Sequence, residues 1–165
     1  MDARRAAELA ARNSYGRLVA YLAVRSHDIS AAEDALGDAF LKALNTWPDK
    51  GVPNNPEAWL LVTARRRLID VARRSQTHAK ILNTLNLSGV ETPDSPSDIT
   101  FPDERLKLLF ICAHPAIHVN IRTPLMLQTV MGLNAAQIGS AFLVAPTTMG
   151  QRLVRAKAKI RDAGI

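Results

Sequence analysis

A stretch rich in proline, serine and acidic residues divides the sequence into two helical halves. From about residue 83 to residue 102 the regular spacing of apolar side chains fades, and three prolines stand among serines, aspartates and a glutamate. This composition disfavours helices and strands and is typical of linkers. We therefore expect two small domains, residues 1–80 and 103–165, joined by a flexible linker over residues 81–102.

Both halves have the composition of packed helices. Hydrophobic residues make up 47% of the chain, whereas aromatic residues make up only 5%, and alanine, leucine and arginine are abundant. Such a mixture favours helices over sheets. We therefore predict an all-α fold.

Three helices are predicted in the first half. The first covers residues 3–26, where leucines and valine recur at helical spacing, and the third covers residues 57–74. The second begins at Ser30, where Glu33 completes a capping box, and ends before Pro48, because the residue before a proline avoids the helical conformation.

The second half ends in two helices joined by a tight turn. Asn134 and Gln137 form a capping box for the shorter helix, while Pro146 opens the longer helix and Gly164 closes it. A short helix, a turn and a longer basic helix form the helix-turn-helix pattern. An earlier helix of this half is expected to begin at Thr123.

The last helix has one apolar face and one polar, basic face. Its apolar side chains recur at helical spacing and are Met149, Leu153, Ala156 and Ile160. The side chains that we predict to contact DNA are Thr147, Thr148, Gln151, Arg152 and Arg155. A helix built in this way packs its apolar side on its own domain while its N-terminal residues read the major groove.

The net charge indicates a polyanionic partner. Lys and Arg number 21 against 15 Asp and Glu, which gives a formal charge of +6. Nucleic acid fits this charge, and so does an anionic membrane surface, but the capped helices and turns indicate folded domains rather than membrane helices. Arginines 65, 66 and 67 lie close to Trp59, which suits single-stranded DNA, although Trp59 also suits a core position.

Several other classes of protein are disfavoured. A single cysteine, Cys112, excludes an internal disulfide and favours the cytoplasm, and no apolar run approaches the roughly 18 residues that span a bilayer. Cys112 lies among large apolar residues and has no second cysteine nearby, so we expect no metal site and no cofactor. We find no nucleophile arrangement or catalytic carboxylate pair, and predict that the protein is not an enzyme.

Three stretches resemble the extracytoplasmic-function (ECF) sigma factors of RNA polymerase, in the order that this family has them. Residues 32–44 resemble its polymerase-binding helix, residues 56–70 its promoter-melting helix, and residues 148–157 its −35 recognition helix. Residues 103–116 further resemble a subgroup that carries an additional C-terminal domain, which would begin where this chain ends.

The resemblance implies a role for each half. Residues 1–80 would bind core RNA polymerase and open the −10 element, and residues 103–165 would read the −35 element, with an anti-sigma protein as a further partner. The implied polymerase contacts are Asp34, Asp38 and Lys42. The implied −10 contacts are Asn54, Asn55, Trp59, Arg65, Arg66 and Asp70.

Two alternatives stay open on the sequence. One is a transcriptional regulator that uses only the helix-turn-helix, with residues 1–80 serving for sensing or dimerisation. The other is a sigma mimic that binds an anti-sigma protein and never contacts DNA. Such a mimic has no need of basic faces, whereas this chain keeps arginines at 65–67 and at 152 and 155.

Overall fold

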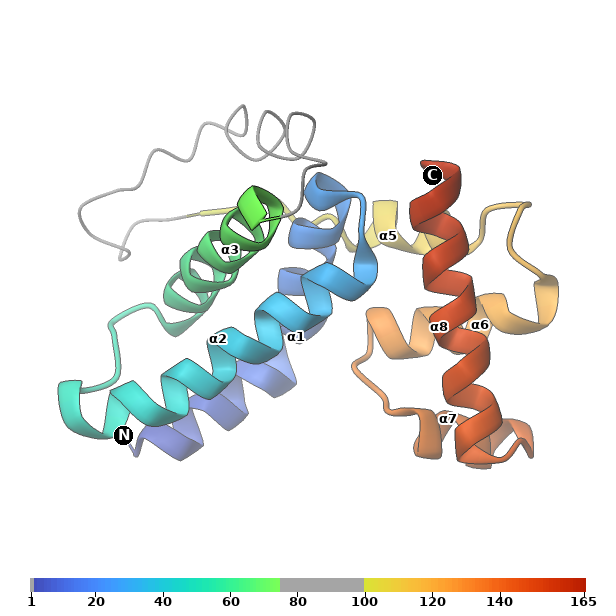
Figure 1. Cartoon of the computed structure of the whole chain (residues 1–165). Coiled ribbons are helices and arrows are strands. Elements are labelled where there is room, and N and C mark those ends of the chain that lie inside the picture. Colours follow the sequence, from blue (N-terminus) through green and yellow to red (C-terminus); the bar gives the residue numbers. More distant parts are fainter. Residues whose placement is uncertain (1, 75–99) are drawn as a thin grey trace.

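The computed structural model describes residues 2–74 and 100–165 (Figure 1). Within these two ranges every regular element is an α-helix, so the predicted all-α fold is confirmed. The helices are α1 (Ala3–Ser26), α2 (Ile29–Lys50), α3 (Pro56–Arg74), α5 (Arg105–Cys112), α6 (Val119–Thr129), α7 (Ala135–Phe142) and α8 (Pro146–Ala163). None of them is both long and apolar enough to cross a membrane. Residues 81–99 of the predicted linker lie outside the described residues, and the division into two domains stays a prediction.

Helices α1, α2 and α3 pack around a core of leucines and small residues. Leu18 and Leu22 of α1 are fully buried against Leu36 of α2 and Leu60 of α3, and alanines fill the spaces between the helices. The three helices run side by side (Figure 1). Helix α1 confirms the helix predicted over residues 3–26.

Helix α2 begins earlier than predicted. Its N-cap is Asp28, whose carboxylate accepts a hydrogen bond from the Ala31 N–H at 3.0 Å. The predicted N-cap, Ser30, lies inside the first turn. The backbone of Asp28 is extended, with φ −144° and ψ 101°, which is the conformation of an N-cap residue.

Helix α2 also ends later than predicted, because it continues through Pro48 to Lys50. Gly51 closes it by donating its backbone N–H to the Trp47 carbonyl at 2.9 Å. Proline lacks an N–H, so Pro48 removes the bond that the Leu44 carbonyl would accept. Leu44 is 43% exposed, and water can satisfy that carbonyl instead.

Helices α5 to α8 form the second group. Each helix contributes a large apolar side chain that is almost completely buried, namely Leu108, Leu125, Ile138 and Leu153. Helix α6 begins at Val119, because the His118 side chain caps it by accepting a hydrogen bond from the Asn120 N–H. The predicted start at Thr123 is therefore wrong.

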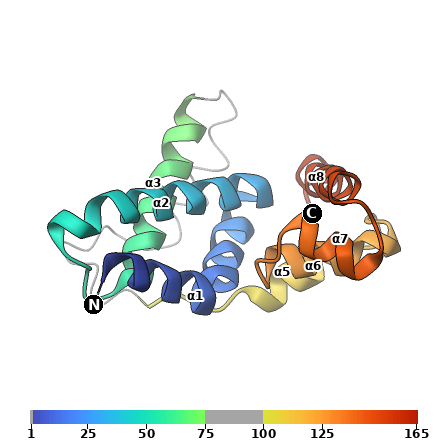
Figure 2. The same cartoon turned by 90° about the horizontal axis from the view of Figure 1, so that it is seen from below.

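The two groups of helices pack directly on each other. Helix α1 contacts α5 and α6, and α2 contacts α8. Figure 2 shows α8 beside the end of α2 where that helix begins. One continuous set of buried side chains runs through both groups.

Candidate nucleic-acid interface

A tight turn sets the direction of α8 relative to α7. The Asn134 side chain accepts from the Gln137 N–H at 2.9 Å, and the Gln137 side chain accepts from the Asn134 N–H at 3.0 Å, which confirms the predicted capping box. Helix α7 ends at Leu143, which takes the left-handed conformation with φ 55°. The Val144 N–H then donates to the Gly139 carbonyl at 2.8 Å, and α8 starts at Pro146.

Helix α8 divides into a buried face and an exposed face, as predicted. The apolar side chains Met149, Leu153, Ala156 and Ile160 are all buried. The sequence did not indicate that Lys157 lies on the same side, where only 7% of the residue is exposed. Gly164 ends the helix in the left-handed conformation, as expected.

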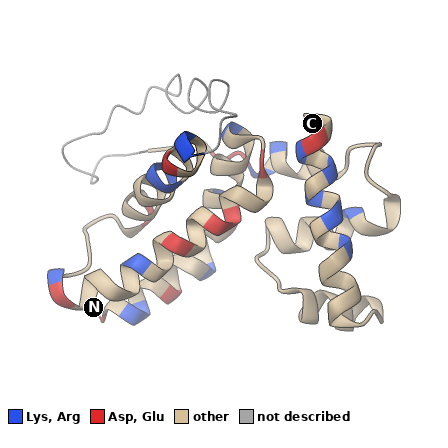
Figure 3. Cartoon of the chain, in the orientation of Figure 1, with Lys and Arg blue, Asp and Glu red and all other residues tan. Residues whose placement is uncertain are grey.

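The structure places all five predicted −35 contacts on the exposed face of α8. These are Thr147, Thr148, Gln151, Arg152 and Arg155. Figure 3 shows that Lys and Arg positions recur along the ribbon of α8. Within the part of the chain that the structure describes, neither Arg152 nor Arg155 forms an ion pair, so both guanidinium groups can meet phosphates.

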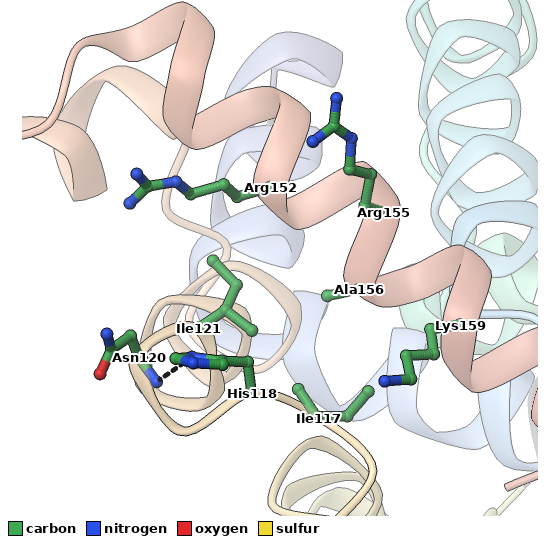
Figure 4. Close-up of a pocket in the computed structure, with 8 residues that line it drawn as sticks. All are labelled: Ile117, His118, Asn120, Ile121, Arg152, Arg155, Ala156 and Lys159. Atoms are coloured by element: carbon green, nitrogen blue, oxygen red, sulfur yellow. Dashed lines mark hydrogen bonds between the residues drawn. The ribbon is translucent and has the colours of Figure 1, made fainter.

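A cavity of about 410 Å³ lies between α8 and the start of α6 (Figure 4). Ile117, Ile121 and Ala156 contribute its apolar lining, while Arg152, Arg155 and Lys159 contribute three positive charges. The Lys159 side chain points across the cavity toward Ile117. This combination extends the basic surface of α8 toward the N-terminus of α6, where backbone N–H groups favour anions.

Helix α3 carries a second basic surface. Arg66, Arg73 and Arg74 are exposed, and Arg65 is partly buried. Arg67 donates from Nε to Asp38 Oδ2 of α2 at 2.7 Å, and both side chains of this pair are about half exposed. The pair therefore adds little stability, in the range of 0–1 kcal/mol that is typical of surface ion pairs.

The other predicted −10 residues differ in their exposure and in their contacts within the protein. Asn54 and Asp70 are exposed. Asn55 is occupied structurally, because its side chain accepts a hydrogen bond from the Ala58 N–H at 3.0 Å and caps α3. Trp59 is partly buried and packs edge-on against Trp47, with ring centroids 5.3 Å apart. Trp59 is thus both a core residue and a partly accessible aromatic surface.

The predicted polymerase contacts form a line on α2. Asp34, Asp38 and Lys42 are spaced four residues apart, and all three are exposed. Glu33 is one position before Asp34, but it points to the other group of helices and forms an ion pair with Lys157. The exposed line of Asp34, Asp38 and Lys42 thus ends beside a carboxylate that is largely buried.

The single cysteine side chain lies inside the fold. Cys112 is fully buried, as expected, and its Sγ lies 3.6 Å from the Thr129 hydroxyl. Burial raises the pKa of the Cys112 thiol to about 11. His114 and His118 each accept a backbone hydrogen bond at Nδ1, and no group of three metal-ligating side chains occurs among the described residues.

Gly139 provides a test of the turn before α8. A Cβ atom at this position would lie 2.5 Å from the Val144 carbonyl oxygen, so Gly139→Ala forces the backbone of the turn to move. We expect it to lower the free energy of unfolding by about 1–3 kcal/mol, measured in urea. Gly150→Ala is the matched control, because its Cβ would make an ordinary 3.7 Å contact with Ala135. Equal stability of the two variants would contradict the assigned role of the turn.

Comparison with known proteins relates the first group of helices to a family of transcription factors. Residues 12–78 match the family model of sigma-70 region 2. The chain is also 36% identical over 143 residues to an uncharacterized protein of Rhizobium meliloti (strain 1021), an alignment that covers 84% of this chain and 34% of the relative. The chain thus spans about a third of the length of that relative. The match over α1, α2 and α3 gives the first half of the chain a region 2 like that of the sigma-70 factors and supports a place for the protein in that family.

Proposed function

We propose that the protein is a sigma factor of the ECF type that directs core RNA polymerase to promoter DNA in the cytoplasm. The observation that carries this proposal is the combination of a sigma-70 region 2 match with a helix-turn-helix whose predicted DNA-reading side chains are all exposed. A regulator that uses only the helix-turn-helix has no need of a region 2. A sigma mimic has no need of the exposed cations on α8.

Readout of the −35 element belongs to the N-terminal part of α8. Thr147, Thr148 and Gln151 are short or uncharged side chains at the end of the helix that would enter the major groove, where hydrogen bonds distinguish the base pairs. Arg152 and Arg155 follow on the same face and would neutralise phosphates. The first three residues therefore give sequence preference and the two arginines mainly give affinity.

Opening of the −10 element belongs to α3 and the loop before it. Trp59 offers part of an aromatic ring, and Arg66 offers an exposed positive charge along the same helix. Aromatic rings stack on unpaired bases while cations follow the backbone. Asn54 is exposed in the preceding loop and is free to contact a flipped base, whereas Asn55 contributes by holding the N-terminus of α3.

Core polymerase would bind the exposed line of Asp34, Asp38 and Lys42 on α2. Two carboxylates and one amine on one face favour a polar partner surface with complementary charge. Asp38 already pairs with Arg67, but this exposed pair is weak enough to be exchanged for a pair with polymerase.

The proposal extends to the subgroup with an additional domain. The resemblance of residues 103–116 to that subgroup is one support, and the greater length of the Rhizobium meliloti relative is another. An anti-sigma protein would compete for the same exposed surfaces.

Run-off transcription tests the function directly. Purified core polymerase is supplied with fragmented genomic template, with and without the protein. We expect new discrete transcripts whose start sites share a −35 and a −10 pattern. Co-elution with polymerase without transcripts would indicate that a further domain is needed for initiation. No binding and no transcripts would refute the proposal in favour of a regulator or a mimic.

Arg155→Ala tests the −35 surface. We expect it to weaken binding to a −35 duplex by roughly 10- to 100-fold, because a hydrogen bond to a charged group is worth about 1.5–3 kcal/mol. The slope of log affinity against log salt should fall by about 0.9, the value for one lost phosphate contact. Arg12→Ala on α1 is the control and should leave both quantities unchanged. Unchanged affinity in Arg155→Ala would remove α8 from the interface.

Asp38→Arg tests the polymerase surface. Reversal of this charge should weaken retention on core polymerase in gel filtration, since it opposes the partner's complementary charge. Asp49→Arg makes the same change at the exposed end of α2, and Arg67→Ala removes the ion pair without reversing a charge at Asp38. If all three variants lose binding equally, the line on α2 is not the docking surface.

A further inference from the structure

The cavity between α8 and the start of α6 combines an apolar floor with a basic rim (Figure 4). Its floor consists of three buried side chains, those of Ile117, Ile121 and Ala156. The other five lining residues are exposed, namely His118, Asn120, Arg152, Arg155 and Lys159. None of the eight lining residues is acidic, so no carboxylate inside the cavity compensates the positive charge of the rim.

Three cations lie along one side of the cavity. Arg152, Arg155 and Lys159 are separated by three and four residues on α8, so their side chains leave the same side of the helix. Like charges at this spacing repel each other and destabilise the helix. In residues 2–74 and 100–165 none of the three forms an ion pair that would relieve the repulsion. An anion bound beside them would relieve it.

The opposite wall offers a hydrogen-bond donor. The Nδ1 atom of His118 accepts a hydrogen bond from the Asn120 N–H at 3.3 Å, which is the dashed line in Figure 4. Because Nδ1 is an acceptor here, the neutral imidazole carries its proton on Nε2, which is a donor. His118 also caps the N-terminus of α6, where the helix dipole favours negative charge. Both walls of the cavity therefore suit an anion.

The apolar floor distinguishes this cavity from a simple phosphate contact. DNA phosphates need only exposed cations and gain nothing from Ile117 and Ile121 beneath them. An apolar group placed on this floor, in contrast, gains free energy in proportion to the apolar area removed from water. The volume of about 410 Å³ is typical of small-molecule sites, which span roughly 300–1,000 Å³. A ligand that uses both parts of the cavity has an apolar body and an anionic group.

We propose that the cavity binds a small amphipathic anion. Its apolar body would lie on Ile117, Ile121 and Ala156, and its carboxylate, sulfonate or phosphate group would lie between His118 and the basic side chains of α8. Because Arg152 and Arg155 also belong to the face that we propose for −35 DNA, the bound anion competes with DNA phosphates. The competition rests on the proposed function, whereas binding of the anion is a property of the chain alone.

Titration of the full chain with octanoate tests the site. Octanoate combines an apolar chain with one carboxylate, whereas octanol has the same chain without the charge and inorganic phosphate has the charge without the chain. Proton–nitrogen correlation NMR follows binding and identifies the residues at the site from their amide signals. We expect octanoate to shift the signals of Ile117, Ile121 and Ala156 until they saturate, and to bind at least about tenfold more tightly than the other two probes.

The two comparison probes decide which part of the cavity matters. Inorganic phosphate that binds as tightly as octanoate would reduce the site to a phosphate contact. Octanol that binds as tightly would remove the cations from the site. Either result would overturn the proposal.

Two exposed positions test the rim without disturbing the core. Asn120→Glu places a carboxylate in the first turn of α6, which the helix dipole tolerates, but which repels the anion. It should weaken octanoate binding at least about tenfold, and Asn13→Glu on an exposed part of α1 should not. Lys159→Ala should weaken binding roughly fivefold, as expected for an exposed ion pair, with Lys50→Ala as its control. Unchanged affinity in both rim variants would contradict the assignment.

Competition with DNA separates the site from the proposed function. Saturating octanoate should lower the affinity of wild type for a −35 duplex at least about threefold, while octanol should have no effect. An unchanged duplex affinity would refute the competition. Octanoate binding by a chain that binds no promoter DNA would refute the sigma function and leave the anion site standing. Duplex binding that shifts the cavity residues, with no binding of octanoate, would refute the anion site and make the cavity part of the DNA surface.

Discussion

The close packing of α1 against four other helices is the constraint on which the arrangement of the molecule depends. Helix α1 contacts α2 and α3 in its own group and α5 and α6 in the other. Its buried residues toward the N-terminus are small, namely Ala3, Ala6, Ala7, Ala10 and Ser14, and they recur at intervals of three and four residues. Small side chains at this spacing allow neighbouring helices to approach closely along a single face. Gly16 likewise allows close packing against the end of α6, because no side chain larger than a hydrogen atom fits at this position.

The polar contacts between the two groups determine orientation more than they contribute stability. Burying Lys157 and Glu33 costs desolvation energy that their attraction roughly offsets, so the intact pair is a weak source of stability. Removing one partner, in contrast, leaves a buried charge and costs about 3–5 kcal/mol. A contact of this kind tolerates only one register between α2 and α8. It is therefore suited to holding one definite arrangement of the two groups of helices.

The fold class and the two faces of α8 could be predicted from sequence because they depend on local patterns. The capping box of Asn134 and Gln137, the start at Pro146 and the end at Gly164 are fixed within a few residues, and α8 has the predicted faces. The errors at Pro48 and Thr123 have a common cause. A proline inside a helix removes one hydrogen bond, and in both helices the carbonyl left free, of Leu44 or Asn120, belongs to an exposed residue. Lys157 could not be predicted to be buried, because its partner Glu33 is distant in sequence and its neighbours Arg155 and Lys159 are exposed.

Helix α8 has two distinct faces because each residue is rotated by about 100° around the helix axis from the residue before it. Thr148, Gln151 and Arg155 therefore fall on one side, while Leu153, Lys157 and Ile160 fall on the opposite side and face the protein. The side that we propose for DNA is therefore separate from the packed side, which carries the Lys157–Glu33 ion pair. One helix thus packs against the first group of helices through one side and keeps its exposed polar residues on the other.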